Sequence, residues 1–312
     1  MTEPLLRRAA AILLDAWHAY RQETFDQDIV DIRWDDPQNI VLVSHFTAPK
    51  RRPAGLIYRC PKELCLDKRE EVILLDQFSC GMACKHMEKL SRWLLQSIIQ
   101  SLEVVFFHVQ GTVFKVWQEV TNVATIHNMQ PLHSVYKITL LDGSLWALDL
   151  TGSQYGWFDP VCAWQELLDI RWDYQASPPS QQPATGEGDG SADSRLSLLE
   201  HAGNSSTGDN DRWDTEVHKR PHHRASVLRY FNEGLQTSLS RHDATRALVM
   251  ATMSPGTGGD SNDSAQGFRD ALIAAVCECA WTAAVFADDI WADTDRDWEY
   301  ALSQESDRED ED

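Results

Sequence analysis

The spacing of apolar residues changes near residue 103, and this change limits the fold class. Between residues 85 and 103 the apolar side chains recur every three or four positions, which predicts one long amphipathic helix. This apolar face consists of Met87, Leu90, Trp93, Leu94, Ile98 and Leu102. From residue 104 onward, β-branched and aromatic residues follow one another in short runs, which are typical of strands. The chain therefore changes from a helical to an extended pattern.

Four strands are expected in two hairpins after this helix. Residues 104–109 and 112–117 flank Gln110-Gly111, and residues 135–140 and 145–150 flank a turn at 141–144. Glycine in such short connections is typical of hairpin turns. Earlier in the chain we expect a helix over 4–20 and strands at 40–45 and 56–59, and a last short helix is expected at 164–170. This order predicts an α+β fold, with N-terminal helices packed on an antiparallel sheet.

Composition divides the chain into four parts. Residues 1–174 carry the helix and strand patterns and are expected to form one α+β domain. Residues 175–215 are rich in Ser, Pro, Gly and Asp and have few large apolar side chains, so we expect a disordered linker. Residues 216–302 are expected to be helical, with helices at 224–250 and 266–287, and 303–312 form an acidic tail. We expect the C-terminal part to be a regulatory or partner-binding appendage.

Charge excludes several classes of partner. The chain has 28 Lys and Arg against 48 Asp and Glu, a formal net charge of −20. Proteins that bind duplex nucleic acid or anionic membranes usually present basic surfaces, so we expect neither partner here. The longest apolar stretch, Ala271 to Ala287, contains Glu278 and is short for a membrane span, so it predicts a packed helix. The N-terminus lacks a secretory pattern, so a cytoplasmic location is expected.

Three residues have the types and positions that a thiol nucleophile requires. Cys84 lies at the expected start of the long helix, where the helix dipole favours a thiolate. His133 begins a predicted strand, and Asp149 lies near the end of the next strand, so the hairpin register brings them close together. An imidazole can take the thiol proton, and a carboxylate can orient the imidazole. The sequence therefore predicts a Cys84–His133–Asp149 triad.

These segments resemble a known superfamily. The order of Gly81-Met82-Ala83-Cys84, His133-Ser134-Val135 and the segment 143–151 is similar to the core of the transglutaminase-like, papain-related cysteine superfamily. The segment 149–156 also resembles a block found in poorly characterised fungal proteins. The resemblance covers residues 75–160 and implies thiol-dependent acyl transfer or amide hydrolysis on a protein, peptide or amide substrate. It implies no cofactor.

A second similarity concerns the segment 77–84. It is similar to the papain-type segment in which Gln precedes Cys-Gly and a further Cys, with one residue inserted before Cys84. The likeness implies that Gln77 donates to an oxyanion, and Gln154 is the alternative donor. Lys85 follows Cys84 where the papain-type segment has an aromatic residue. An inactive descendant of the fold is therefore an open alternative.

Zinc is a competing use of the same cysteines. Cys60 and Cys65 are separated by four residues, and Cys80 and Cys84 by three. Four thiolates can bind Zn²⁺ tetrahedrally, with His86 as a substitute ligand. A zinc site would occupy Cys84, so it would make the chain a non-enzymatic interaction module.

Overall fold

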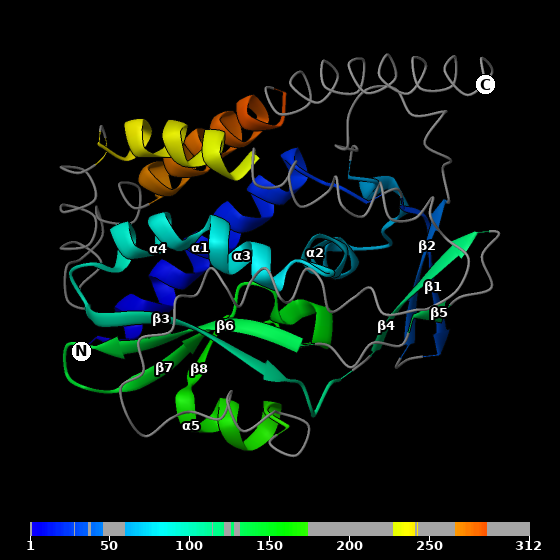
Figure 1. Ribbon diagram of the computed structural model, residues 1–312, viewed down its shortest axis with the longest axis horizontal. Coiled ribbons are helices and arrows are strands. Elements are labelled where there is room, and N and C mark those ends of the chain that lie inside the picture. The colour runs from blue at the N-terminus through cyan, green and yellow to red at the C-terminus, as the bar shows by residue number, and fades with distance from the viewer. Residues whose placement is uncertain are drawn as a thin grey trace, which may run out of the picture.

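The computed structural model describes residues 2–27, 29–36, 39–45, 60–113, 115–121, 126–127, 132–173, 227–240, 242 and 266–285. Helices and two sheets form the α+β architecture that the sequence predicts (Figure 1). The expected linker at 175–215, the strand at 56–59 and the acidic tail at 303–312 lie outside these residues. No helix among the described residues is long and apolar enough to cross a membrane.

Helix α1 (Glu3–Glu23) is the centre of the main core. Pro4 lies in its first turn, where a missing backbone N–H leaves no helical hydrogen bond unmade. Its inward stripe includes Leu6, Leu13 and Trp17, all fully buried. Burial of each such side chain stabilises the fold by about 1.5–3 kcal/mol. The stripe packs on α3 (Cys80–His86), α4 (Glu88–Leu95) and one face of a sheet.

That sheet is antiparallel and carries the residues of interest. Its order is β3 (Ile99–His108), β6 (Leu132–Leu140), β7 (Leu145–Leu148) and β8 (Val161–Ala163). One face contacts α1 and α4, and the other face packs on α5 (Trp164–Glu166) and η4 (Leu167–Arg171) through Trp164 and Trp172. The sheet therefore lies between two helical layers.

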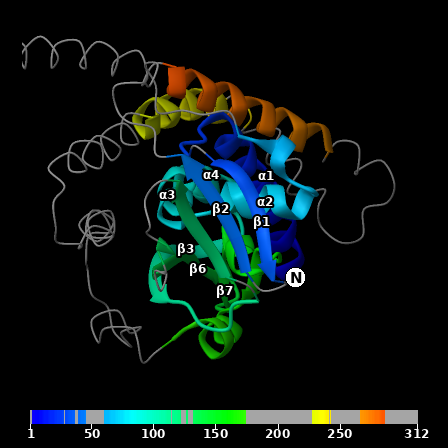
Figure 2. The same ribbon diagram turned by 90° about the vertical axis from the view of Figure 1, so that its right-hand side faces the viewer.

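A second sheet has a hydrophobic core of its own. Its order is β1 (Ile29–Asp36), β2 (Asn39–His45), β4 (Lys115–Thr121) and β5 (Ile126–His127), with β2 and β4 parallel. Helix α2 (Lys68–Asp76) and the 3-10 turn η2 (Lys62–Leu64) pack beside it, with Phe25 and Ile40 in the shared core. Figure 2 shows β1 and β2 side by side.

Two sequence predictions about this region are wrong. The long helix ends at Leu95, and strand β3 begins at Ile99, because the residues after a short turn pair with β6. The hairpin predicted around Gln110-Gly111 is absent, since β3 pairs with β6 while β4 pairs with β2 in the other sheet. Gly111 has a φ of +65° and lies against the backbone oxygen of Ile170. It therefore allows a close approach between segments. The second predicted hairpin, β6–β7, is present.

The two helices at 227–240 and 266–285 belong to the main core. Phe231 contacts Tyr20 of α1 with 4.7 Å between ring centroids, and Phe268 stacks on Trp93 of α4 at 6.2 Å. Both helices lie over α1 in Figures 1 and 2. The expectation of an appendage therefore does not describe these helices, because their apolar faces complete the layer around α1.

Candidate active site

His133 and Asp149 meet at one end of the antiparallel sheet. In the β6–β7 register Tyr136 lies opposite Leu148, so His133 near the start of β6 comes close to the residue that follows β7. The Nε2 atom of His133 is 3.0 Å from Oδ2 of Asp149, and the side chains are 0% and 2% exposed. The other carboxylate oxygen accepts the backbone N–H of Thr151 at 3.1 Å. The carboxylate is thus held in place and orients the imidazole ring.

Aromatic side chains enclose the imidazole. Phe107, Tyr155 and Trp157 surround the His133 ring, with centroids at 5.5, 4.9 and 6.3 Å. Such rings exclude water, and the interaction between buried charges strengthens as water is removed. The His133–Asp149 pair is therefore a buried, nearly dry pair.

The cysteine beside this pair is Cys80, one helical turn before Cys84. Cys80 begins α3, is partly exposed and lies with its sulfur 3.7 Å from the Leu132 carbonyl oxygen. Its thiol interacts with the His133 ring. The remaining ring nitrogen, Nδ1, has no hydrogen bond of regular geometry to a described residue, so the contact is loose, as is common in sites without substrate.

Cys84 lies deeper in the same helix. It is 3% exposed, belongs to the main core, and its backbone oxygen accepts a hydrogen bond from the Tyr136 hydroxyl. Because α3 starts at Cys80, Cys84 lies one turn further along the same face of the helix, where it belongs to the main core. The expected Cys84–His133 pairing is therefore not what the structure brings together.

Charge distinguishes the two thiols. Burial works to raise the pKa of Cys80, but the contact with His133 and its positive charge outweigh burial, so the pKa is lowered. Burial likewise works to lower the pKa of His133, while Asp149 and Cys80 raise it overall. Burial raises the pKa of Cys84 well above its usual value. Cys80 therefore favours a thiolate beside an imidazolium, and Cys84 stays a thiol.

Two glutamines were expected as oxyanion donors, and they differ in availability. Gln154 donates from Nε2 to the Thr151 carbonyl at 2.9 Å, so its amide is used within the 3-10 turn η3 (Gly152–Tyr155). Gln77 is buried, and its Oε1 has no hydrogen-bond partner in the described part of the chain. The first backbone N–H groups of a helix also have no intrahelical acceptor. The backbone N–H groups at the start of α3 are thus the candidate donors, while the unpartnered atom of Gln77 is an acceptor and its donor role stays what the papain likeness implies.

The backbone before Cys80 is strained. Phe78 has a φ of +53°, and no other non-glycine residue in the described ranges has a positive φ. A bulky residue in this region costs about 1–3 kcal/mol and is often found at functional sites. The strained residue directs the chain from α2 into α3 and positions the Cys80 thiol.

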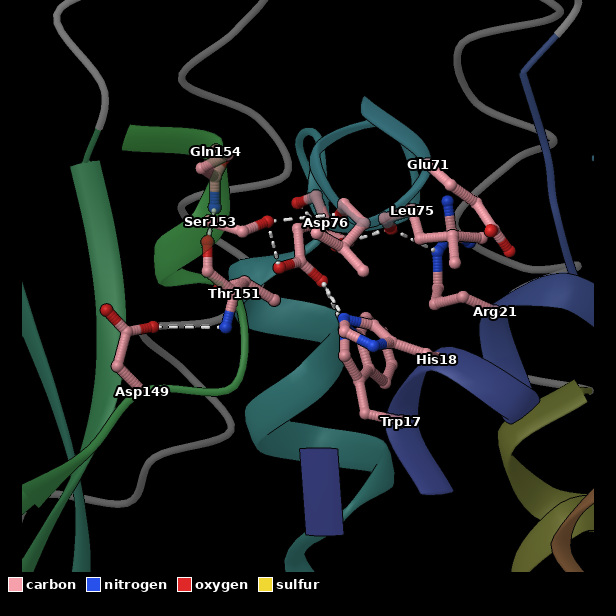
Figure 3. A network of polar contacts seen from close by, with 12 residues as sticks. Trp17, His18, Arg21, Glu71, Leu75, Asp76, Asp149, Thr151, Ser153 and Gln154 are labelled. Atoms are coloured by element: carbon pink, nitrogen blue, oxygen red, sulfur yellow. Dashed lines mark hydrogen bonds and ion pairs between the residues drawn. The ribbon is translucent and has the colours of Figure 1, made fainter. Parts of the chain in front are cut away.

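A buried carboxylate, Asp76, connects the elements that carry Cys80 and Asp149. It accepts hydrogen bonds from Trp17 Nε1 at 3.0 Å and Ser153 Oγ at 2.5 Å, and forms a 3.2 Å contact with His18 Nε2 (Figure 3). Its backbone oxygen accepts the hydroxyl of Ser79, the residue before Cys80, at 2.7 Å. Asp76 therefore joins α1, the start of α3 and the turn that follows Asp149.

Replacing Asp76 with alanine is expected to lower the free energy of unfolding by about 3 kcal/mol, because buried donors on Trp17 and Ser153 lose a charged acceptor. Urea denaturation measures the change. The matched control is Asp169→Ala, since the exposed Asp169 carboxylate bonds to the Gln165 amide on the same short helical segment. We expect its effect to stay within about 0.5 kcal/mol. Equal losses in the two variants would contradict the role of Asp76.

Gly152 leaves room for the Asp149 carboxylate. A Cβ atom at this position would lie 2.7 Å from the Trp157 backbone oxygen and 2.8 Å from Oδ2 of Asp149. Any side chain would therefore push the carboxylate away from His133.

The Gly152→Ala variant is expected to lose about 1–3 kcal/mol of stability and to alkylate more slowly at Cys80, because Asp149 no longer aligns the imidazole. Thermal unfolding and mass-spectrometric alkylation rates measure the two effects. Gly267→Ala is the control, since an added Cβ there meets no atom within 4 Å. A normal alkylation rate in Gly152→Ala would show that the carboxylate tolerates displacement.

The four cysteines of the zinc alternative lie in two separate places. Cys60 and Cys65 belong to the core of the second sheet, and Cys84 belongs to the main core. Cys80 interacts with its neighbour Cys84, and Cys60 with Cys65. Among the described residues no group of three or more metal-ligand side chains comes together. The sequence spacing suggested one site, but the intervening α2 separates the pairs.

Sequence reasoning missed Cys80, Asp76 and Gly152 as contributors to the site. Ser79 immediately precedes Cys80, and serine is a common residue just before a helix, so a helix start at Cys80 was recognisable from the sequence. The roles of Asp76 and Gly152 depend on contacts with distant segments and have no local pattern. A surface hollow lies elsewhere, on the second sheet beside Arg33, Val41 and Trp117.

Comparisons of this chain with protein-family models, curated proteins and solved structures gave no match.

Proposed function

We propose that this protein catalyses thiol-dependent acyl transfer or amide hydrolysis, with Cys80 as the nucleophile in place of Cys84. The observation that carries the proposal is the buried His133–Asp149 pair beside a partly exposed thiol at a helix start. His133 holds the thiol proton, and Asp149 holds the imidazole and stabilises its charge. The substrate is a protein, peptide or other amide.

The reaction follows from these roles. The Cys80 sulfur attacks the carbonyl carbon, and the backbone N–H groups at the start of α3, with Gln77, stabilise the oxyanion. When the tetrahedral species collapses, the C–N bond breaks and the His133 imidazolium gives its proton to the leaving amine. Water or an acceptor amine then attacks the thioester and loses a proton to His133, which releases the acid or the new amide and restores the thiol.

The aromatic residues around His133 also support the proposed thiol chemistry. Tyr155 and Trp157 lie against the imidazole and limit the access of water to it. The nucleophile requires a free thiol, so we propose that the protein works in a reducing compartment such as the cytoplasm.

Acyl-enzyme trapping tests this function. The full chain is incubated at neutral pH with an aryl thioester as acyl donor, and intact-mass and peptide mass spectrometry locate the adduct. We expect one acyl group on Cys80, released by hydroxylamine and discharged by water or an added amine. If Cys80 reacts readily with iodoacetamide but never carries or discharges an acyl group, the chain is an inactive descendant and the proposal is wrong.

A further inference from the structure

Arg171 is a buried cation beside the site. It ends η4, a π-helical turn of the kind often found at functional sites, and is 8% exposed. Its backbone oxygen accepts the N–H of Gln110 at 2.9 Å, and the next residue, Trp172, forms a bridge to Val109. The Arg171 backbone is thus tied to the end of β3.

The guanidinium group reaches the oxygen of Asp149 that contacts His133. Its Nη1 is 4.0 Å from Oδ2 of Asp149, and its central carbon lies 4.6 Å from the centre of the Trp157 ring. Trp157 in turn contacts the His133 ring. The cation and the imidazole therefore lie beside the same carboxylate oxygen.

No other acid in the described ranges lies within 4.0 Å of this cation, and its buried Nη1 has no hydrogen-bond partner there. A buried charge is costly unless another charge compensates it. The packing on Trp157 fixes the guanidinium plane, so the charge acts on Asp149 from a defined place.

We propose that Arg171 is a positioning residue that holds Asp149 against His133 and balances its negative charge, so that the Cys80 thiolate forms in a site of zero net charge. This inference rests on the proposed function. Arg171 touches neither the thiol nor the substrate in this scheme and acts through the carboxylate.

The charges in the site give the direction in which the loss of Arg171 shifts the pH of thiolate formation at Cys80. With Arg171 present, Cys80, His133, Asp149 and Arg171 carry charges of −1, +1, −1 and +1 when the thiolate has formed. Without Arg171 the same step leaves a buried site with a net charge of −1, so the thiolate forms at higher pH.

Neighbouring groups do not supply the missing charge. Burial raises the pKa of Tyr155 well above its usual value and that of Cys162 to about 11, so both are neutral near pH 7. Glu166 from α5 and Asp159 from the segment before β8 act on Cys162 and add only negative charge. Among these neighbours, Arg171 alone balances Asp149 from this side.

The test is the pH dependence of iodoacetamide alkylation at Cys80, followed by peptide mass spectrometry on the full chain. We expect the alkylation midpoint of Arg171→Met to rise by about one pH unit, with roughly tenfold slower alkylation on the acidic side. Arg171→Lys keeps the charge and should stay within a few tenths of a unit of wild type. Arg171→Gln keeps a planar amide on Trp157 and should behave like Arg171→Met, so a methionine variant that fails to fold leaves the test intact.

A double substitution checks that the effect passes through Asp149. Adding Arg171→Gln to Asp149→Asn should raise the midpoint less than Arg171→Gln raises it in the wild type, because the carboxylate that Arg171 positions is already gone. Equal midpoints in wild type and Arg171→Gln would overturn the inference, even if the variant were less stable. Failure of the proposed function has a different signature, because wild-type Cys80 would then form no acyl-enzyme whatever the effect of Arg171.

Discussion

Replacing Cys80 with alanine is expected to abolish acyl-enzyme formation and to lower turnover roughly 10³-fold or more, whereas Cys84→Ala retains both activities. The reason is position. Cys80 starts α3, is partly exposed and contacts the His133 ring, while Cys84 lies in the core with a pKa raised well above its usual value by burial. Turnover of an aryl thioester and intact-mass analysis measure the difference.

The two alanine variants control for each other, because each removes one sulfur from the same face of one helix. We expect Cys84→Ala to lose stability, since its side chain is 3% exposed and removal leaves a cavity. Its acyl adduct should still map to Cys80. If Cys84→Ala lost the adduct and Cys80→Ala kept it, Cys84 would be the nucleophile and the helix start would not decide reactivity.

Replacing His133 with alanine is expected to raise the pH at which Cys80 alkylates and to slow alkylation at pH 6.5 by about 10–100-fold. In the wild type, the contact with His133 and its positive charge lower the pKa of Cys80 against the effect of burial, so thiolate is present at lower pH. Without the imidazolium, the two contributions from His133 that lower the pKa of Cys80 are lost and the pKa rises. Iodoacetamide rates between pH 5 and 10 give the midpoint directly.

Other residues of the same chain provide the controls for this pH profile. Asp149→Asn should shift the midpoint in the same direction, because the imidazolium loses the carboxylate at 3.0 Å that favours its charge. Cys65 is partly exposed, and burial raises its pKa to about 12, so its slow alkylation should be the same in every variant. An unchanged Cys80 midpoint in His133→Ala would mean that the imidazole does not activate the thiol.

The His133–Asp149 proximity was accessible from the sequence because it depends on a local hairpin. The turn at 141–144 contains Gly143, whose φ is +82°, and short turns set the register of the strands that they join. Once β6 and β7 pair, a residue near the start of one lies close to a residue just after the other. Local turn chemistry was therefore sufficient to predict this part of the site.

The choice between Cys80 and Cys84 had only one local signal in the sequence, the serine that precedes Cys80. Periodicity alone predicted one helix from 85 to 103, but α3 starts at Cys80, directly after Ser79, whose hydroxyl donates to the backbone oxygen of Asp76. Asp76 is itself held by Trp17 of α1 and Ser153 of η3. The helix starts earlier than predicted, so the cysteine at its start is the partly exposed Cys80 and not the buried Cys84.

The sheets and the last two helices also had local patterns that predicted the elements but not their packing partners. The segments 104–109 and 112–117 have strand composition, yet they pair in different sheets, because β2 and β6 supply longer matching partners from distant parts of the chain. The helices at 227–240 and 266–285 followed from their apolar patterns, but their place over α1 depended on Tyr20 and Trp93.

The amino-acid sequence by itself determined the α+β class, the β6–β7 hairpin and the pairing of His133 with Asp149, because these depend on periodicity and turn chemistry over short separations. Only the tertiary structure decided which sulfur contacts the imidazole and which cation balances the carboxylate. Those choices depend on where a helix begins and on how distant segments pack, and both are set by contacts among buried side chains far apart in the chain.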